Sequence, residues 1–368
     1  MLTAATSVVP PPATGFRVKT TRVPAIDGLR AISIIGVVGF HGSWRGFSNG
    51  GLGVDLFFVI SGYLITSLLL NEQCIRGQVN LRAFYARRFF RIIPALAVYL
   101  LGFSLLCVVV YKDFLDKLLL SLACAAFFVT NIAIGWFDVG VLAAHTWSLS
   151  MEEQFYLVFP WLLRCMTYRR LTLMALAVAI LTPLWRAALF LVVGPENLPP
   201  HRFAYSPDTR LDTIAMGCLL ALLLHKGRQR AILARMSGSA AAFVCGAAVI
   251  AASCYFSSIA CYRYVLHSSV VAVACTMLVA WGAHSSLGLL NAVVASWPMV
   301  YCGRISYSLY LWHPAILGIA HRASPHLPPR LACIGDCFIY VGLTLAVAMA
   351  SYHLVELSAL RIKQRYSV

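Results

Sequence analysis

Two neighbouring carboxylates, Glu152 and Glu153, stand directly before an apolar run in the stretch HTWSLSMEEQFYLVFP, which begins at His145. The chain has only 13 acidic residues among 368, so a pair at the start of a hydrophobic segment needs an explanation. Carboxylates inside a membrane protein are functional candidates, because they can move protons, orient a histidine or bind substrate hydroxyls. Ser150 and Glu153 also have the spacing of a capping box, in which Glu153 would close the start of a helix.

The same stretch predicts a polar and aromatic mouth on the outer side of the protein. Glu152 and Tyr156 are four residues apart and therefore share a helical face, with His145 and Trp147 just upstream. We expect Glu152 to orient a histidine or to bind acceptor hydroxyls. We expect Glu153 chiefly to cap its helix, with a supporting role in the site.

Arg30 and His41 lie near the inner and outer ends of the apolar segment AIDGLRAISIIGVVGFH. Their separation corresponds to about 16 Å of helix axis and about three turns, so they share a similar face at two depths. Asp55, in GGLGVDLFFVISGYLI, enters the next segment at the depth of His41, where a carboxylate can hold the imidazole in one tautomer. Simpler roles stay open: Arg30 can snorkel, His41 can bond a carbonyl, and Asp55 can face a helix dipole.

The segment ARRFFRIIP alternates arginines with aromatic residues where a third apolar run begins. Arg88 and Arg91 are three residues apart and lie on one helical face. Guanidinium groups bind phosphate in a bidentate manner, so this face predicts a phosphate clamp. The alternative is a topology signal that also contacts lipid headgroups.

The elements that position these residues are transmembrane helices. Sixty per cent of the residues are hydrophobic and 11% are charged, and apolar runs of spanning length recur along the chain, which indicates an all-α, polytopic transmembrane helical bundle. The net charge of +16 reflects basic cytoplasmic loops rather than nucleic-acid binding. We expect about ten spans, with cytoplasmic N- and C-termini. They lie near 26–44, 52–71, 92–111, 148–166, 171–193, 211–226, 240–258, 264–283, 304–321 and 332–356.

The segment 117–135 is apolar enough to cross, but a full crossing would invert every later basic loop. We therefore expect it to enter the membrane without completing an independent span. The predicted domains are a cytoplasmic tail at 1–24, a transmembrane domain at 25–357 and a basic cytoplasmic tail at 358–368. The 12 cysteines form no CxxC or Cys/His cluster, so no metal site is expected.

Six stretches together resemble the acyltransferase-3 family of integral membrane acyltransferases, in the order that the family has them. They are IDGLRAISIIGVVGFH, GVDLFFVISGYLIT, FYARRFFRIIP, HTWSLSMEEQFYLVFP, RLDTIAMGCLLALLL and ISYSLYLWHP. The stretch SYHLVELSAL departs from the pattern, because it lacks the Lys-Pro that often follows Val-Glu in relatives, so Glu356 receives no role.

The resemblance implies O-acylation, most often O-acetylation, with acyl-coenzyme A (acyl-CoA), typically acetyl-CoA, as the cytoplasmic donor. The acceptor would be a carbohydrate or a lipid-linked glycan, and the protein would lie in the lipid bilayer of the bacterial inner membrane; a homo-oligomer is left open. Arg30, Arg88 and Arg91 fall on positions expected to hold the donor phosphates, and His41 falls on the essential histidine. Arg210 and Asp212 match a further motif, and we interpret them as an ion pair lining the same cavity.

Two mechanisms remain open at this point. His41, oriented by Asp55 or Glu152, can act as general base for direct attack of the acceptor hydroxyl on the thioester, or it can carry the acyl group itself. We expect His313, in the last of the six stretches, to be a packing or cavity histidine. A transporter or flippase is the rival function, because it too would place Arg, His and Glu along a pathway.

Overall fold

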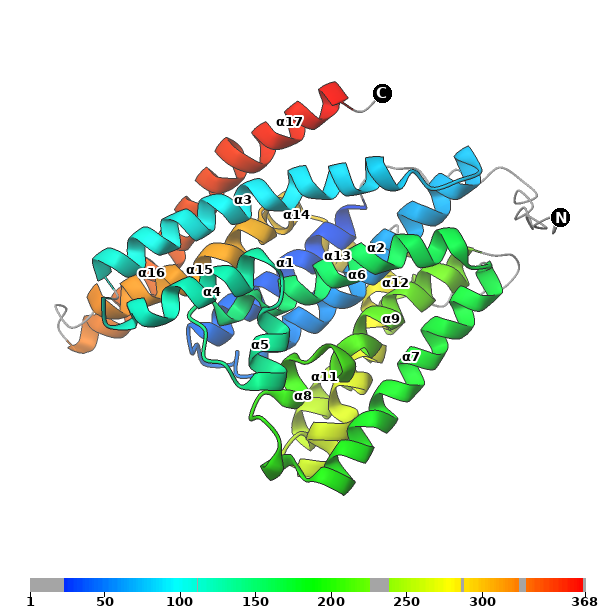
Figure 1. Cartoon of the computed structure of the whole chain (residues 1–368), viewed down its shortest axis with the longest axis horizontal. Helices are drawn as coiled ribbons and strands as arrows, with labels where there is room; N and C mark the ends of the chain where they lie inside the picture. The colour runs from blue at the N-terminus through cyan, green and yellow to red at the C-terminus, as the bar shows by residue number, and fades with distance from the viewer. Residues whose placement is uncertain (1–22, 111, 226–237, 286–287, 324–328, 367–368) are drawn as a thin grey trace.

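The computed structural model describes residues 23–110, 112–225, 238–285, 288–323 and 329–366. Residues 1–22 of the expected N-terminal tail and 226–230 of a basic loop lie outside the described residues. Every regular element in the described part of the chain is helical, which confirms the predicted all-α class (Figure 1). The α-helices are α1 (Pro24–His41), α2 (Gly53–Arg76), α3 (Leu81–Val110), α4 (Leu118–Ala126), α5 (Thr130–Phe137), α6 (Trp147–Cys165), α7 (Tyr168–Ala188), α8 (Arg202–Tyr205), α9 (Pro207–His225), α11 (Ala240–Phe256), α12 (His267–His284), α13 (Leu289–Val294), α14 (Trp297–Arg304), α15 (Ser306–Ala323), α16 (Pro329–Ser351) and α17 (Leu357–Tyr366).

Six helical segments among the described residues are long and apolar enough to cross a membrane. They are Pro24–His41, Gly50–Arg76, Leu81–Val109, Tyr168–Val193, Tyr262–His284 and Phe338–Arg361. Each of the segments expected to cross is helical, but α6, α9, α11 and α15 do not meet both criteria of length and composition. The helix α11, for example, has 17 residues, which is short for a span of about 20.

The segment 117–135 is broken in the structure. Residues Leu115–Ala126 and Thr130–Phe137 form two helices that meet at an angle of 118°. A bend of this size divides the apolar run, so it does not form one straight span. The expectation that this segment makes no independent crossing agrees with the bend.

The helix α3 is longer than the sequence indicates. It begins at Leu81 rather than near residue 92, and it continues through Pro94 to Val110. The basic turn and the apolar run therefore belong to one continuous helix, with Pro94 in its interior. This continuity fixes the arginines of ARRFFR rigidly along one helical surface.

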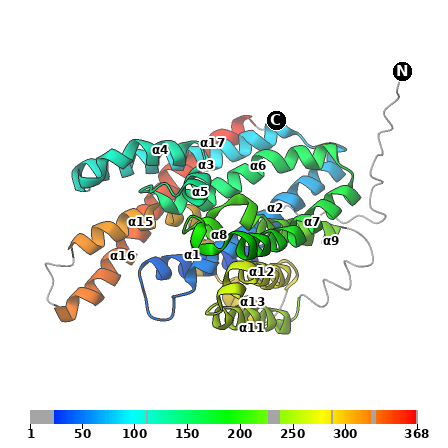
Figure 2. The ribbon, with the colours of Figure 1, turned by 60° about the horizontal axis from the view of Figure 1, so that its bottom comes forward.

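The helix α1 lies in the middle of the bundle, with α3 and α17 along one side and α7, α9, α11 and α12 on the other (Figure 1). Figure 2 shows α15 and α16 running together away from the group formed by α11, α12 and α13. The helices α2 and α9 pack closely because Gly62 and Gly217 face each other: a Cβ on Gly217 would lie 2.1 Å from the carbonyl oxygen of Val59. A second close approach joins α14 to α1, where a Cβ on Gly303 would lie 1.8 Å from the carbonyl oxygen of Asp27.

Candidate active site

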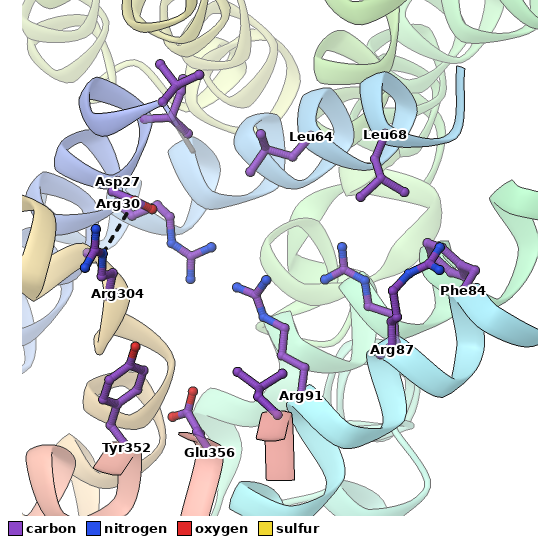
Figure 3. Close-up of a pocket in the computed structure, with 15 residues that line it drawn as sticks. Asp27, Arg30, Leu64, Leu68, Phe84, Arg87, Arg91, Arg304, Tyr352 and Glu356 are labelled. Carbon is purple, nitrogen blue, oxygen red and sulfur yellow. Dashed lines mark ion pairs between the residues drawn. The ribbon is translucent and has the colours of Figure 1, made fainter. Parts of the chain in front are cut away.

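A cavity of about 320 Å³ lies between α1, α2, α3, α14 and the C-terminal helices. Five arginines and two carboxylates are among the residues that line it: Arg30, Arg87, Arg88, Arg91, Arg304, Asp27 and Glu356. We call this cavity the arginine pocket. Figure 3 shows Arg30 and Arg91 extending into it from different helices. The excess of guanidinium groups suits a ligand with several negative charges.

Two of these arginines are held by ion pairs. Arg87 lies 3.2 Å from Glu72, and Arg304 lies 4.0 Å from Asp27, the pair marked in Figure 3. Neither Arg87 nor Arg304 was singled out from the sequence. The unusual density of arginine in ARRFFR was a signal for Arg87, whereas only the close packing of α14 on α1 brings Arg304 to the pocket.

A serine holds the guanidinium group of Arg30, and aromatic rings hold that of Arg88. Arg30 donates from Nη2 to the hydroxyl of Ser306 at 2.9 Å. The guanidinium of Arg88 lies over the ring of Tyr156, 4.5 Å from its centroid. Such cation–π contacts fix direction and leave the N–H groups free for an anion. The structure therefore brings Arg30, Arg88 and Arg91 together, as the sequence predicted.

Two smaller cavities adjoin the arginine pocket and lie deeper in the helical bundle. One, of about 70 Å³, is lined by Arg30, Arg88, Arg91, Glu152 and Tyr156 among others. The next, of about 60 Å³, is lined by Arg30, Glu152, Ser148 and Tyr310 among others. Successive cavities share lining residues, Arg88 and Arg91 in the first two and Glu152 in the last two, and Arg30 lines all three, so they adjoin in a series from the arginine pocket to Tyr310.

Glu152 lies in this series and not beside His41. Its Oε1 accepts from the hydroxyl of Ser61 at 2.5 Å, and its Oε2 accepts from Tyr156 at 3.4 Å. The shared face of Glu152 and Tyr156 is therefore confirmed. Of the two roles expected for Glu152, these contacts do not fit the orientation of His41, and the binding of acceptor hydroxyls stays a prediction. Glu152 lies beside the arginines instead, where cations offset the cost of burying a carboxylate.

The capping box predicted for Ser150 and Glu153 is absent. The helix α6 begins at Trp147, earlier than the box requires, so Ser150 lies inside the helix and donates to the carbonyl oxygen of Thr146. Serine in a helix interior commonly makes this i−4 bond. Glu153 consequently has no free backbone N–H to accept from, and its Oε1 is buried without a hydrogen-bond partner among the described residues.

Three histidines lie together next to Tyr310, at the end of the cavity series that is farthest from the arginine pocket. The rings of His41 and His313 are 4.9 Å apart, and those of His145 and His313 are 5.8 Å apart. Tyr310, which lines the last cavity, lies 5.6 Å from both His145 and His313. We call His41, His145 and His313 the histidine cluster. The sequence singled out His41 and His145 as site residues, and it predicted His313 to be a packing or cavity histidine, which fits its place beside Tyr310.

Asp55 contacts Arg210 and not His41, so the orienting role expected for Asp55 is wrong. Its Oδ1 accepts from Nη2 of Arg210 at 2.7 Å, and both side chains are buried. The expected pair between Arg210 and Asp212 is also wrong, because residues two apart on a helix point to different sides.

Asp212 pairs instead with Arg186 of α7 at 2.9 Å, and both residues are fully buried. Arg186 also donates to the hydroxyl of Ser268 and to the carbonyl oxygen of Val265, so the guanidinium is well satisfied. Arg186 was not predicted from the sequence. A lone arginine inside the apolar run 171–193 was the available signal.

Trp147 contributes to an aromatic group beside the short helix α8. Its ring stacks on Tyr205 at 4.6 Å, and Tyr205 stacks on His201 at 5.0 Å. Trp147 therefore faces α8, whereas His145 faces the histidine cluster, and the single mouth expected for both is divided in two.

Asp208, in the first turn of α9, binds side chains from α5, α7 and α8. Its carboxylate accepts hydrogen bonds from Arg202, from Trp185 at 2.7 Å and from Trp136 at 3.1 Å. Partial burial alone would raise the pKa of this carboxyl, but the three donors outweigh it, and the pKa lies below its ordinary value.

Comparison with known proteins identifies the family of the chain. The profile of the acyltransferase domain matches residues 23–353, nearly the whole chain, so the chain belongs to the acyltransferase-3 family. It is 29% identical over 359 residues to the peptidoglycan O-acetyltransferase OatA of Listeria monocytogenes. The aligned region covers 92% of this chain and 56% of the relative. It is also 29% identical over 351 residues to the O-acetyltransferase OatA of Staphylococcus aureus strain NCTC 8325, covering 91% and 56%.

The chain thus spans about half the length of the curated relatives it matches. No solved structure matches it.

Proposed function

We propose that the protein is a membrane-embedded O-acyltransferase that moves an acetyl group from acetyl-CoA to a hydroxyl of a carbohydrate or lipid-linked glycan. The observation that carries this proposal is the series of cavities that leads from the arginine pocket to Tyr310, whose ring lies 5.6 Å from two rings of the histidine cluster. A donor with phosphates at one end and a thioester at the other fits such a series. The similarity to OatA proteins supports acetyl as the group and a cell-wall glycan as the acceptor class.

The arginine pocket would hold the nucleotide end of the donor. Arg88 and Arg91, three residues apart on α3, present guanidinium groups to the same volume as Arg30. The pyrophosphate would take bidentate hydrogen bonds from these groups. The extended arm of coenzyme A would follow the smaller cavities past Glu152, and the thioester would lie near Tyr310.

His41 would act as the general base. Its Nδ1 hydrogen bonds to the carbonyl oxygen of Val37 at 2.9 Å, so Nδ1 carries the proton and Nε2 presents a lone pair. Nε2 would take the proton of the acceptor hydroxyl while the oxygen attacks the thioester carbon. A C–O bond forms, the C–S bond breaks, and the proton passes from His41 to the departing thiolate. General-base catalysis of this kind contributes a factor of about 10²–10⁴.

The topology belongs to the same proposal. We place about ten spans in the bacterial inner membrane, with both termini and the arginine pocket on the cytoplasmic side, where acyl-CoA is found. The helices α6, α9, α11 and α15 would then cross as short or polar spans that are shielded by their neighbours. The polar side chains of such spans face the interior of the bundle, as the side chains of Glu152 and Arg210 do here.

The test uses purified protein in sealed vesicles that contain a soluble glycan acceptor. Labelled acetyl-CoA is added either to one side of the membrane or to both sides. Release of coenzyme A with label in the glycan is the expected result. Movement of glycan or acyl donor into the vesicles without any release of coenzyme A would contradict the proposal and favour a transporter.

A further inference from the structure

We infer that His313 is a positioning residue that holds His41 in its reactive tautomer and stabilises the charge that His41 acquires. The inference rests on the proposed function, in which His41 is the general base. Nε2 of His313 lies 3.3 Å from Nδ1 of His41. A neutral imidazole thus stands where a carboxylate more commonly orients a catalytic histidine.

The tautomer of His313 follows from its backbone contacts. Its Nδ1 lies 2.9 Å from the carbonyl oxygen of Tyr310 and 3.2 Å from that of Leu309. A carbonyl oxygen only accepts, so Nδ1 of His313 carries the proton and Nε2 holds a lone pair. That lone pair points at Nδ1 of His41.

The tautomer of His41 follows in the same way. Its Nδ1 faces two acceptors, the carbonyl oxygen of Val37 at 2.9 Å and Nε2 of His313 at 3.3 Å. Both require a proton on Nδ1. Nε2 of His41 has no hydrogen-bond partner among the described residues, and it is therefore left as the base.

The sequence His-Pro explains why the carbonyl of Tyr310 is free. In a helix this carbonyl would accept from the backbone N–H of the residue four positions later, which is Pro314. Proline has no N–H, so the side chain of His313 takes its place. Pro314 lies inside α15, and His313 is fully buried, so the ring is fixed in direction.

Besides the backbone carbonyl of Val37, His313 is the only side chain of the described residues that hydrogen bonds to His41. The titratable side chains nearest to it are His41 from α1, His145 from the turn before α6 and Tyr310 from α15, with Tyr99 of α3 beyond His145. No Asp or Glu in the described part of the chain lies within ion-pair distance of either His41 or His313. Asp55, the nearest candidate from the sequence, is bound to Arg210.

The chemical role is specific. When Nε2 of His41 takes the acceptor proton, the imidazolium donates more strongly from Nδ1–H to Nε2 of His313. Charge-assisted hydrogen bonds are roughly twice as strong as neutral ones, so the contact favours the state in which His41 is charged. No proton needs to reach His313.

The experiment compares His313→Leu, which has no acceptor, with His313→Gln, whose amide oxygen can accept from His41. The probe is acetyl-CoA with water as acceptor, and release of coenzyme A is followed against pH. We expect His313→Leu to lower kcat at least about tenfold, a part of the general-base factor, with KM for acetyl-CoA unchanged. The acidic limb of its pH profile should move to lower pH, because the protonated His41 loses an acceptor. His313→Gln should recover part of the rate.

The matched control is His284→Leu, because Nδ1 of His284 also bonds an i−4 carbonyl, that of Ala280 at 2.9 Å, at the end of α12. It should behave as wild type. Unchanged kcat and an unchanged pH profile in His313→Leu would overturn the inference while leaving the proposed function intact.

A second measurement keeps the two proposals separate. Nitrogen NMR of the protein labelled at histidine reports which ring nitrogen is protonated. We expect Nδ1–H on both His41 and His313, and a shift of the His41 Nδ1 signal in His313→Gln. A proton on Nε2 of His41 would overturn the inference. This spectrum remains decisive if wild-type protein releases no coenzyme A, a result that would count against the proposed function alone.

Discussion

Arg30 donates from Nε and Nη2 to the hydroxyl of Ser306, at 3.3 and 2.9 Å, although the two residues are 276 positions apart. The contact joins α1, the first helix described, to α15 near the end of the chain. It also holds Arg30 at the junction of all three cavities. The cavity series is therefore assembled from both ends of the sequence, and it depends on the packing of α14 and α15 against α1.

Replacing Arg88 tests the donor end. Arg88→Ala removes a guanidinium held over Tyr156, and hydrogen bonds to charged groups contribute about 1.5–3 kcal/mol. We expect the Kd for coenzyme A to rise about 10- to 100-fold in equilibrium binding to the purified protein. Arg170→Ala, at an exposed position of α7, is the control and should bind as wild type. Equal affinities for the two variants would show that Arg88 does not bind the donor.

The buried pair of Asp55 and Arg210 predicts a loss of stability. Asp55→Asn leaves the guanidinium of Arg210 buried without its carboxylate, which costs about 3–5 kcal/mol. Unfolding in detergent should show a lower midpoint for this variant. Asp138→Asn changes an exposed acid and should leave the midpoint unaltered. If the two variants unfold alike, the ion pair contributes nothing.

The close approach of α2 and α9 predicts an effect of a single methyl group. Gly217→Ala places a Cβ 2.1 Å from the carbonyl oxygen of Val59, so the helices must separate at a cost of about 1–3 kcal/mol. Gly342→Ala is the control, because nothing lies within 4 Å of its Cβ, and it should gain up to about 1 kcal/mol from helix propensity. Thermal unfolding of both variants in one detergent measures the difference. A stable Gly217→Ala would mean that the two helices are not in contact there.

Asp208 predicts how stability depends on pH. Its pKa is lowered in the folded protein, because the bonds from Arg202, Trp185 and Trp136 outweigh burial, so it stabilises the fold above the unfolded value of about 4. That contribution is lost as the pH falls through the folded pKa. Below about pH 4, the unfolding midpoint of the wild-type protein should therefore fall more steeply with decreasing pH than that of Asp208→Asn. Parallel curves for the two proteins would contradict this assignment.

The class of fold could be predicted from the sequence because apolar runs of spanning length set it directly. The extent of individual elements could not. The sequence placed the start of the third span near residue 92, whereas α3 begins at Leu81, since an arginine-rich turn continues a helix without any break in backbone hydrogen bonding. In the same way α6 begins at Trp147, and this start removes the capping box that Ser150 and Glu153 suggested.

Residue types in the site were predicted better than their partners. Arg30, Arg88, Arg91, Glu152 and His41 are charged or titratable groups in apolar segments, and such groups stand out by their cost alone. Their partners depend on which helices meet, and local spacing does not encode this. Asp55 and His41 have similar expected depths, but Asp55 pairs with Arg210 instead. The close packing of α2 against α9 places Arg210 beside Asp55.

The most direct test of the whole account is to separate donor binding from turnover in His41→Gln. The account predicts that this variant binds coenzyme A with wild-type affinity, because His41 lies beyond the arginine pocket, and that release of coenzyme A from acetyl-CoA falls about 100-fold or more. Turnover that survives in His41→Gln would contradict the account, and so would a loss of coenzyme A binding equal to that of Arg88→Ala.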